Sequence, residues 1–313
     1  MFQYVVRRLL VMIPVLIGVT LVISSVVYLS PGNPAQIALG QNANPEAIEE
    51  LEAEMGLNDP PHVRYLDWLA GAAQGDLGTS VRSQRPVSEM IMERLPATLE
   101  LAIASMALTL IIALPLGVIS AVKQYTWVDS LSMVFAIFWI SMPSFWLALI
   151  LILLFSVNWS IFPISGRATP VFTATWLMSL ALPAIATGTR RAGLLTRMTR
   201  SSMLEILNED YIRTARGKGI GDSAVIYTHA MKNAMIPIIT LIGLQIPLIF
   251  SGAVIIETVF AWPGMGRLLV NAVLSRDYPV VQGTVLVYAV IVIAANLAVD
   301  VAYSYFDPRI KYD

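Results

Sequence analysis

The sequence contains no cysteine, only two histidines and few charged residues. Without cysteine the chain has no disulfide, no thiolate nucleophile and no Cys-ligated zinc or iron–sulfur cluster. Neither His62 nor His229 sits in a ligand-spaced cluster with carboxylates, so the sequence predicts no metal site. A formal net charge of −1 removes the case for a nucleic-acid-binding protein.

Apolar side chains are abundant instead. Of the 313 residues 57% are hydrophobic and 13% are charged, and the mean hydropathy is +0.70. Soluble domains carry about a quarter charged residues, and a chain this apolar lacks the polar side chains to cover itself in water. The composition therefore predicts a helical protein whose solvent is lipid, since one spanning helix needs about 20 apolar residues.

Six apolar stretches are long enough to cross a bilayer as helices. They cover residues 9–29, 97–122, 130–157, 176–195, 236–259 and 281–303. Pro115, Pro143, Pro183 and Pro247 fall within them and predict kinks, which a bundle tolerates when neighbouring helices satisfy the freed carbonyls. The sequence thus predicts an all-α membrane protein with six transmembrane helices.

The distribution of basic residues predicts the orientation of these helices. An even number of spans puts both termini on one side, where 13 of the 20 Lys and Arg residues lie, against seven on the other side. By the positive-inside rule both termini are cytoplasmic. The chain then divides into an N-terminal segment with the first helix (1–29), an extracytoplasmic segment (30–96) and a five-helix core (97–313). Within the outer segment, Pro45 and the acidic stretch after it predict a short amphipathic helix.

The main cytoplasmic loop, at about 196–235, has the pattern of a short helix between glycine-rich corners. Asn208 predicts the N-cap, and Glu209 and Asp210 would lie beside the positive end of the helix dipole. Asp222 predicts the cap of a second helix that runs on into the fifth span. The residues that end the first helix are glycines, namely Gly217, Gly219 and Gly221.

This short helix suits insertion into a groove on a soluble partner. Its modest apolar face is expected to be formed by Tyr211, Ile212, Thr214 and Ala215. The alternative is a solvated loop that lies on anionic lipid head groups.

The chain has no phosphate-binding loop of its own. Gly188 and Gly193 have the required spacing, but Leu194 and Leu195 follow where Lys and Ser or Thr are needed. The chain therefore cannot hydrolyse ATP itself.

Polar groups within the apolar stretches are candidates for a translocation path, because ionisable side chains are costly in a bilayer. Glu100 and Glu257 lie near the outer ends of the second and fifth spans, where they could meet a substrate amino group or pair at a gate. Asn296 in the sixth span is a further candidate for the path. The alternative for the two carboxylates is a hydrated position at a helix end.

The loop carries a resemblance to a known family. The run Glu209-Asp210-Tyr211-Ile212-Arg213-Thr214-Ala215-Arg216-Gly217-Lys218-Gly219, with His229-Ala230-Met231-Lys232-Asn233-Ala234 nine residues later, resembles the ATPase-coupling loop of binding-protein-dependent ABC-transporter permeases. More narrowly, the chain resembles the first permease subunit of dipeptide, oligopeptide, nickel and glutathione import systems. Further motifs of that group include Ser30-Pro31-Gly32-Asn33-Pro34, Gly75-Asp76-Leu77-Gly78, Leu95-Pro96-Ala97-Thr98-Leu99-Glu100, Pro143-Ser144-Phe145-Trp146, the run from Glu257 to Gly266 and Asp307-Pro308-Arg309-Ile310.

One departure affects the loop. The wider permease pattern opens with an acid and two alanines, where this chain has Arg213, Thr214 and Ala215. The acidic contact to an ATPase is therefore expected at Glu209 or Asp210.

The resemblance implies the type I ABC importer permease fold and a non-catalytic subunit of the prokaryotic plasma membrane. It implies a heterodimer with a homologous second permease, two cytoplasmic ABC ATPases that bind ATP and Mg, and an extracytoplasmic solute-binding protein, with no cofactor in this chain. The implied coupling residues are Glu209, Asp210, Tyr211, Thr214, Ala215, Arg216, Gly217, Lys218 and Gly219. Peptide is the expected cargo, with nickel or glutathione as alternatives. An ion-coupled secondary transporter is the other class considered, but such folds usually show internal repeats, and the two halves of this sequence show none.

Overall fold

The structure is a computed structural model that describes residues 2–29, 34–39, 44–54 and 56–306. Most of the predicted motif at 30–34 and the motif at 307–310 lie outside the described residues. In the described part the regular structure is helical, apart from one isolated bridge between Thr79 and Pro86. The predicted all-α class is confirmed.

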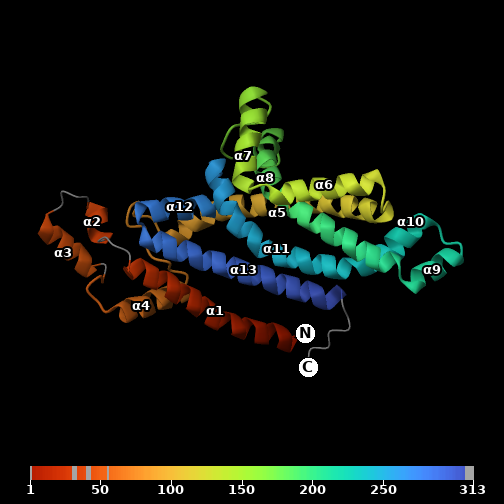
Figure 1. Cartoon of the computed structure of the whole chain (residues 1–313). Coiled ribbons are helices and arrows are strands. Elements are labelled where there is room, and N and C mark those ends of the chain that lie inside the picture. Colours follow the sequence, from red (N-terminus) through yellow and green to blue (C-terminus); the bar gives the residue numbers. More distant parts are fainter. Residues whose placement is uncertain (1, 30–33, 40–43, 55, 307–313) are drawn as a thin grey trace. The chain divides into compact units, whose positions relative to one another are not determined.

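The helices follow one another in the order that Figure 1 labels. The first five are α1 (Phe2–Leu29), α2 (Pro34–Leu39), α3 (Pro45–Glu54), α4 (Pro61–Ala73) and α5 (Val87–Val122). The next group is α6 (Trp127–Ser141), α7 (Ser144–Leu151), the π-helical η1 (Ile152–Asn158), α8 (Ala174–Leu207) and α9 (Asp210–Gly217). The last are α10 (Asp222–Ala224), the π-helical η2 (Val225–Ala230), α11 (Met231–Val259), α12 (Met265–Ser275) and α13 (Tyr278–Phe306). The acidic helix predicted after Pro45 is α3.

The chain forms two compact units. One comprises Met1–Thr98 with Pro263–Ala294, and the other comprises Leu99–Trp262 with Ala295–Asp313. The boundary at Thr98 falls inside α5, so the units do not coincide with segments read along the chain. The predicted division at residues 29 and 96 describes membrane topology and stays a prediction.

Polar contacts join distant parts of the first unit. The hydroxyl groups of Thr20 and Tyr65 lie 2.9 Å apart and connect α1 to α4. The Gln282 amide donates to Ser24 at 3.0 Å and connects α13 to α1. The apolar core of this unit includes Leu77, Val87, Ile91, Met265, Ala272, Val280 and Val281.

α8 is the central helix of the second unit and packs against α6, α7 and α11. Its glycines permit close approach: a Cβ atom on Gly193 would lie 2.5 Å from the carbonyl oxygen of Ala136 in α6. A Cβ atom on Gly188 would lie 2.8 Å from the carbonyl oxygen of Ser105 in α5, and that glycine's own carbonyl accepts a hydrogen bond from Thr109. Small residues at helix crossings are typical of membrane bundles, where packing holds the helices together.

The predicted third span is broken. α6 and α7 meet at a bend of 100°, because Met142 and Pro143 both adopt extended backbone angles. Proline disfavours the helical region for the residue before it, so the helix ends at Ser141. The kink predicted at Pro143 is therefore present, and it is sharp enough to divide the stretch over 130–157 into two helices.

By length and composition, four described helices are apolar enough to span a membrane, or five if the bent pair counts as one. They are Leu10–Tyr28, Val87–Val122, Asp222–Val259 and Tyr278–Val299. The predicted fourth span lies in α8, which has 34 residues but carries Arg190, Arg191, Arg197 and Arg200 from its middle onward. Because of these arginines, α8 is not counted among the spans by composition, although it contains the fourth of the six predicted spans.

Candidate functional site

The predicted cytoplasmic helix is present as α9, and its C-terminal end has a defined geometry. Gly219 has a φ of +77°, the left-handed conformation that favours glycine. Its N–H donates to the Arg216 carbonyl at 2.9 Å, and the Ile220 N–H donates to the Ala215 carbonyl at 3.3 Å. This pair of bonds is a Schellman motif, in which a glycine just past the helix reverses the chain and satisfies its last carbonyls.

The capping predictions for this loop were wrong in detail. The N-cap of α9 is Glu209 rather than Asn208, which belongs to the end of α8 and donates its side-chain amide to the Leu204 carbonyl at 2.9 Å. Gly221, not Asp222, precedes α10, and Asp222 is the first residue of that helix. α10 continues through η2 into α11, as predicted. Asp210 in the first turn and Arg216 in the last turn of α9 complement the helix dipole.

The apolar face of α9 is narrower than predicted. Ile212 is fully buried and Ala215 nearly so, in a cluster with Met203 of α8 and Ala234 of α11. Thr214 and Tyr211 are exposed. The Thr214 hydroxyl donates to the Asp210 carbonyl, and the Tyr211 hydroxyl accepts from Asn233 at 2.7 Å. α9 is thus attached in two ways: Ile212 and Ala215 pack in a cluster shared with α8, η2 and α11, and Tyr211 makes a hydrogen bond to α11.

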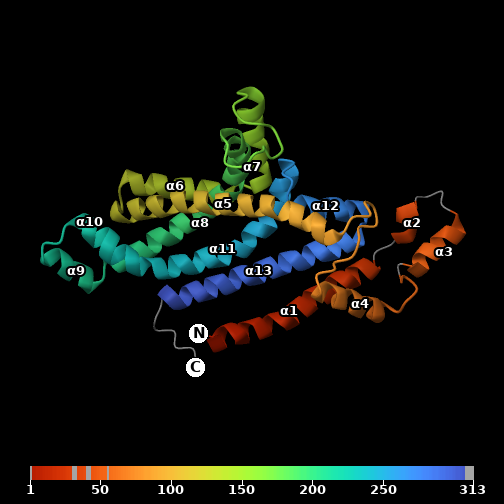
Figure 2. The same ribbon diagram turned by 180° about the vertical axis from the view of Figure 1, so that it is seen from behind.

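The remaining predicted coupling residues lie on the surface. They are Glu209, Asp210, Arg216, Gly217, Lys218 and Gly219. Arg216 approaches Asp222 at 3.7 Å and Arg213 approaches Asp210 at 3.6 Å, but these ion pairs are solvated and contribute little stability. Figures 1 and 2 both show α9 and α10 beyond the ends of α8 and α11. The structure therefore brings all nine predicted coupling residues together on one short, projecting element.

The candidate path residues lie in different environments. Glu100 accepts two hydrogen bonds from Arg167, at 2.6 and 2.8 Å, and a third from the Trp176 indole at 3.1 Å. Arg167 lies in the loop before α8. The hydrogen bonds to Glu100 raise the pKa of the Arg167 guanidinium, which therefore stays charged. Glu257 is fully buried near the end of α11, whereas Asn296 is exposed on α13.

The structure also contains a pocket that was not predicted. It has a volume of about 390 Å³ and lies within the second unit. Its lining residues come from α6, α7, α8 and α11: Ile140, Ser144, Thr187, Arg190, Arg191, Leu194, Gln245, Leu248, Ser251, Gly252 and Ile256. Glu100, Glu257 and Asn296 are not among them.

The sequence held a signal for this pocket. Arg190 and Arg191 interrupt an otherwise weakly polar stretch of α8, and Gln245 stands alone in a long apolar stretch of α11. The positive-inside count places both arginines on the cytoplasmic side of the membrane. Arg191 in fact contacts Leu248 in the middle of α11.

Comparison with known families covers nearly the whole chain. The family model described as "Binding-protein-dependent transport system inner membrane component" matches residues 113–312, and the model of its N-terminal part matches residues 1–102. The chain belongs to this family. It is therefore a multi-pass plasma-membrane permease, the membrane component of a binding-protein-dependent ABC importer.

Full-length relatives agree with this assignment. The permease is 47% identical over 333 residues to the dipeptide transport system permease protein DppB of Alkalihalophilus pseudofirmus, with 100% of each chain covered. It is 42% identical to DppB of Escherichia coli K12, covering 100% of this chain and 99% of that one. It is also 42% identical to the oligopeptide transport system permease protein AppB of Bacillus subtilis, with 100% of each chain covered.

Solved structures confirm the fold. A chain of the MetNI methionine ABC transporter, in an inward-facing conformation, aligns with a TM-score of 0.58 at 17% identity and covers 70% of the permease and 96% of that chain. An amino acid ABC transporter crystallised with histidines aligns with a TM-score of 0.51 at 13% identity. The predicted type I importer fold is thus confirmed.

Proposed function

We propose that this permease forms half of the translocation pathway of an ABC importer that takes up di- or oligopeptides delivered by an extracytoplasmic solute-binding protein. The support is the similarity over the full length to permeases named for dipeptide and oligopeptide transport, at 42–47% identity. Nickel and glutathione are the alternative cargoes, because the sequence motifs of the group do not separate them. The termini lie in the cytoplasm in this proposal.

The permease does not hydrolyse ATP and holds no cofactor in this proposal. Its sequence lacks the lysine-bearing phosphate loop that ATP binding needs. Two cytoplasmic ABC ATPases bind ATP and Mg, and a homologous second permease completes a heterodimer. This division of labour agrees with membership in a family of membrane components.

The observation that carries the coupling role is the two-sided character of α9. Ile212 and Ala215 attach the helix to the core that α8 and α11 share, while Asp210, Arg213 and Thr214 are exposed. A partner that binds the exposed face of α9 can therefore displace α8 and α11, because the buried face of α9 packs in the cluster that these helices share. ATP-driven closure of the ATPases would displace α9 and change the access of the pathway from outward to inward by movement of packed helices.

The first experiment reconstitutes the permease with its second permease and two ATPases in liposomes. ATP is supplied on the side of the membrane that carries the ATPases, and the binding protein is supplied on the other side. Dipeptide uptake that depends on ATP and on the binding protein is expected. Nickel and reduced glutathione are tested in the same vesicles as competing cargoes. Uptake by the permease alone, driven by an ion gradient without ATP, would refute the importer assignment.

A second experiment tests the exposed face of α9. Thr214→Trp adds bulk on this face without touching the core and is expected to abolish association with the ATPases, measured by co-purification in mild detergent. Thr214→Ser keeps the hydroxyl that donates to Asp210 and serves as the matched control, with association unchanged. Equal co-purification of both variants would contradict the docking role.

Glu100, Glu257 and Asn296 are proposed as path or gate residues. Since Glu257 is buried, it would meet cargo only after a movement of α11 uncovers it. Glu257→Gln keeps the shape and removes the charge, so a loss of uptake at unchanged expression is expected. Unchanged uptake would remove Glu257 from the path.

A further inference from the structure

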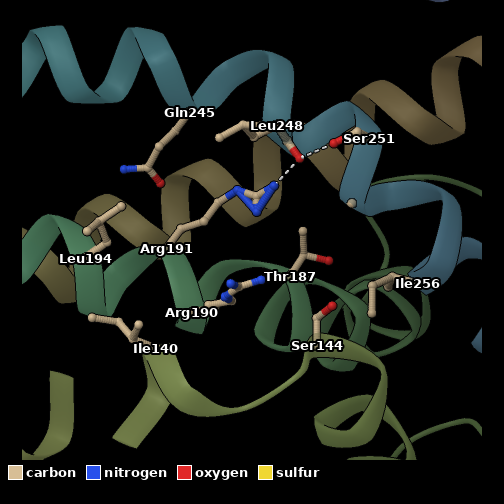
Figure 3. Close-up of a pocket in the computed structure, with 11 residues that line it drawn as sticks. Ile140, Ser144, Thr187, Arg190, Arg191, Leu194, Gln245, Leu248, Ser251 and Ile256 are labelled. Atoms are coloured by element: carbon tan, nitrogen blue, oxygen red, sulfur yellow. Dashed lines mark hydrogen bonds between the residues drawn. The ribbon is translucent and has the colours of Figure 1, made fainter. Parts of the chain in front are cut away.

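The pocket of the second unit contains a buried polar side chain whose hydrogen bonds are unmade. Gln245 of α11 is 3% exposed, and neither its Oε1 nor its Nε2 has a hydrogen-bond partner among the residues that the structure describes. A buried amide without partners is costly, and more so within a bilayer, where water is scarce. Figure 3 shows the Gln245 amide directed into the space between α8 and α11. A ligand that both donates and accepts hydrogen bonds would satisfy it.

The same pocket is cationic. Arg191 donates through Nη2 to the Leu248 carbonyl, but its buried Nε has no partner in the described part of the chain. Arg190 also lines the pocket, and the eleven lining residues include no aspartate or glutamate. Charged side chains inside a membrane protein are rare, pair with one another or with backbone carbonyls, and mark substrate pathways.

The donors in the pocket match an anionic group with two oxygens. The Arg191 guanidinium and the Gln245 amide project into the space from facing helices, α8 and α11 (Figure 3). Guanidinium groups bind carboxylates through charge-assisted hydrogen bonds, which are about twice as strong as neutral ones. The Gln245 Oε1 would remain free to accept from an amide N–H. The apolar side chains of Leu194, Ile140 and Ile256 line the rest of the pocket.

We propose that this pocket binds the terminal carboxylate of a peptide during its passage, with Arg191 and Gln245 as the contacting residues. The proposal rests on the proposed peptide cargo and adds a site for it within this subunit. In a peptide, the amide N–H of the last residue lies next to the terminal carboxylate. The Gln245 Nε2 can donate to that carboxylate, and the Gln245 Oε1 can accept from that N–H. An anionic lipid head group lacks that amide, so the two sources differ in a measurable way.

The absence of cysteine permits a direct test on the assembled transporter. Ser144→Cys places one reactive thiol in the lining of the pocket. The partner subunits are treated with a thiol-blocking reagent before they are assembled with this variant. The complex is held in lipid nanodiscs without the binding protein, and the rate of reaction with a small maleimide is measured against the concentration of added alanyl-alanine. Protection by alanyl-alanine, and none by its C-terminal amide at the same concentrations, is the expected result. Thr187→Cys is a second reporter from α8.

Variants of Gln245 separate binding from structure. Gln245→Leu replaces the amide with a slightly smaller apolar side chain, so it should raise the thermal midpoint of the complex by removing a buried polar group that has no partner among the described residues. It should also raise the half-protecting concentration of alanyl-alanine about tenfold, the loss expected for one hydrogen bond to a charged group. Arg191→Gln should also raise the half-protecting concentration of alanyl-alanine about tenfold. The matched control is Leu244→Ala, at an exposed neighbouring position of α11, which should leave protection unchanged.

Several outcomes would overturn the inference. They are equal protection by the peptide and its amide, protection that follows the content of anionic lipid instead of the peptide, or no reaction at either reporter thiol. A fall in the thermal midpoint of Gln245→Leu with unchanged protection would show a structural role. If the vesicles described above take up peptide in an ATP-dependent way, any of these results rejects only the proposed pocket. If they take up no peptide, the proposed cargo is rejected.

Discussion

Buried polar residues in the second unit fall into two groups, according to whether their side chains have hydrogen-bond partners. Asp129 accepts from Arg200 at 2.7 and 2.8 Å, from Ser120 at 2.6 Å and from the Tyr125 N–H at 3.1 Å. A carboxylate with this many partners holds α8 to the turn between α5 and α6. Gln245 in the pocket has none among the described residues, so burial alone does not tell the two roles apart.

Removing one member of the Asp129 pair should be costly, because Asp129 is 5% exposed and would be left as an unpaired charge. Arg200→Ala is expected to destabilise the permease by about 3 kcal/mol or more. Arg200→Lys should lose less, since the ammonium keeps the charge but not the two-pronged geometry. Thermal unfolding of the purified complex measures both effects. Arg197→Ala, at an exposed position three residues earlier, is the control, and a loss there equal to that of Arg200→Ala would contradict the argument.

At the scale of elements, glycines determine where helices end and how closely they pack. Gly219 ends α9 with a positive φ, whereas Gly217, two residues earlier, has open space around it and an ordinary helical position. Gly193 lies at the crossing of α8 with α6, whereas Gly18 of α1 has no neighbouring atom within 4 Å of an added Cβ. Each pair gives a sensitive glycine and a tolerant one.

Gly219→Ala should strain the end of α9, because a side chain in the left-handed region costs roughly 1–2 kcal/mol. Uptake per ATP hydrolysed is expected to fall, since the packing of Ile212 and Ala215 of α9 in the cluster shared with α8 and α11 would loosen. Gly217→Ala should be tolerated and should even favour the helix. The measurement is the ratio of peptide uptake to phosphate release in vesicles, and an equal ratio for both variants would argue against a role for the Schellman motif.

Gly193→Ala should force α8 away from α6, because the added methyl would meet a backbone oxygen that cannot rotate aside. Overpacking of this kind costs about 1–3 kcal/mol. The expected result is a lower thermal midpoint of the purified permease. Gly18→Ala is the matched substitution in an open helical position, and the explanation fails if it lowers the midpoint as much.

At the scale of the whole molecule, the orientation in the membrane is predicted from the arginine and lysine distribution and not from the fold. The loop that contains α9 and the segment that contains Ser83 lie on opposite sides in the predicted topology. Both are exposed, and the permease has no cysteine to interfere with labelling.

Ser223→Cys and Ser83→Cys should therefore react with a membrane-impermeant maleimide from opposite sides. In intact cells the thiol at position 83 is expected to be labelled and the one at position 223 protected until the cells are permeabilised. Each variant serves as the control of the other. Labelling of position 223 in intact cells would reverse the predicted topology.

The sequence by itself determined the helical class, the membrane environment, the family and the position of α9. These features depend on local information: apolar runs, helix-ending glycines and a series of motifs in a fixed order along the chain. The caps at Asn208 and Asp222 were predicted one residue away from the observed N-caps, Glu209 and Gly221, because local rules do not separate adjacent residues that can each precede a helix. The break at Met142 and Pro143 was predicted only as a kink, because local rules do not set the size of a bend.

Only the tertiary structure decided which polar side chains are satisfied. Whether Glu100 meets Arg167, or Asp129 meets Arg200, depends on segments far apart in the sequence, at separations of 67 and 71 residues. The pocket around Gln245 and Arg191 depends on the crossing of α8 and α11 in the same way. Hydrogen bonds and packing act over a few ångströms in space, so a one-dimensional pattern cannot show which groups find partners and which are left for a ligand.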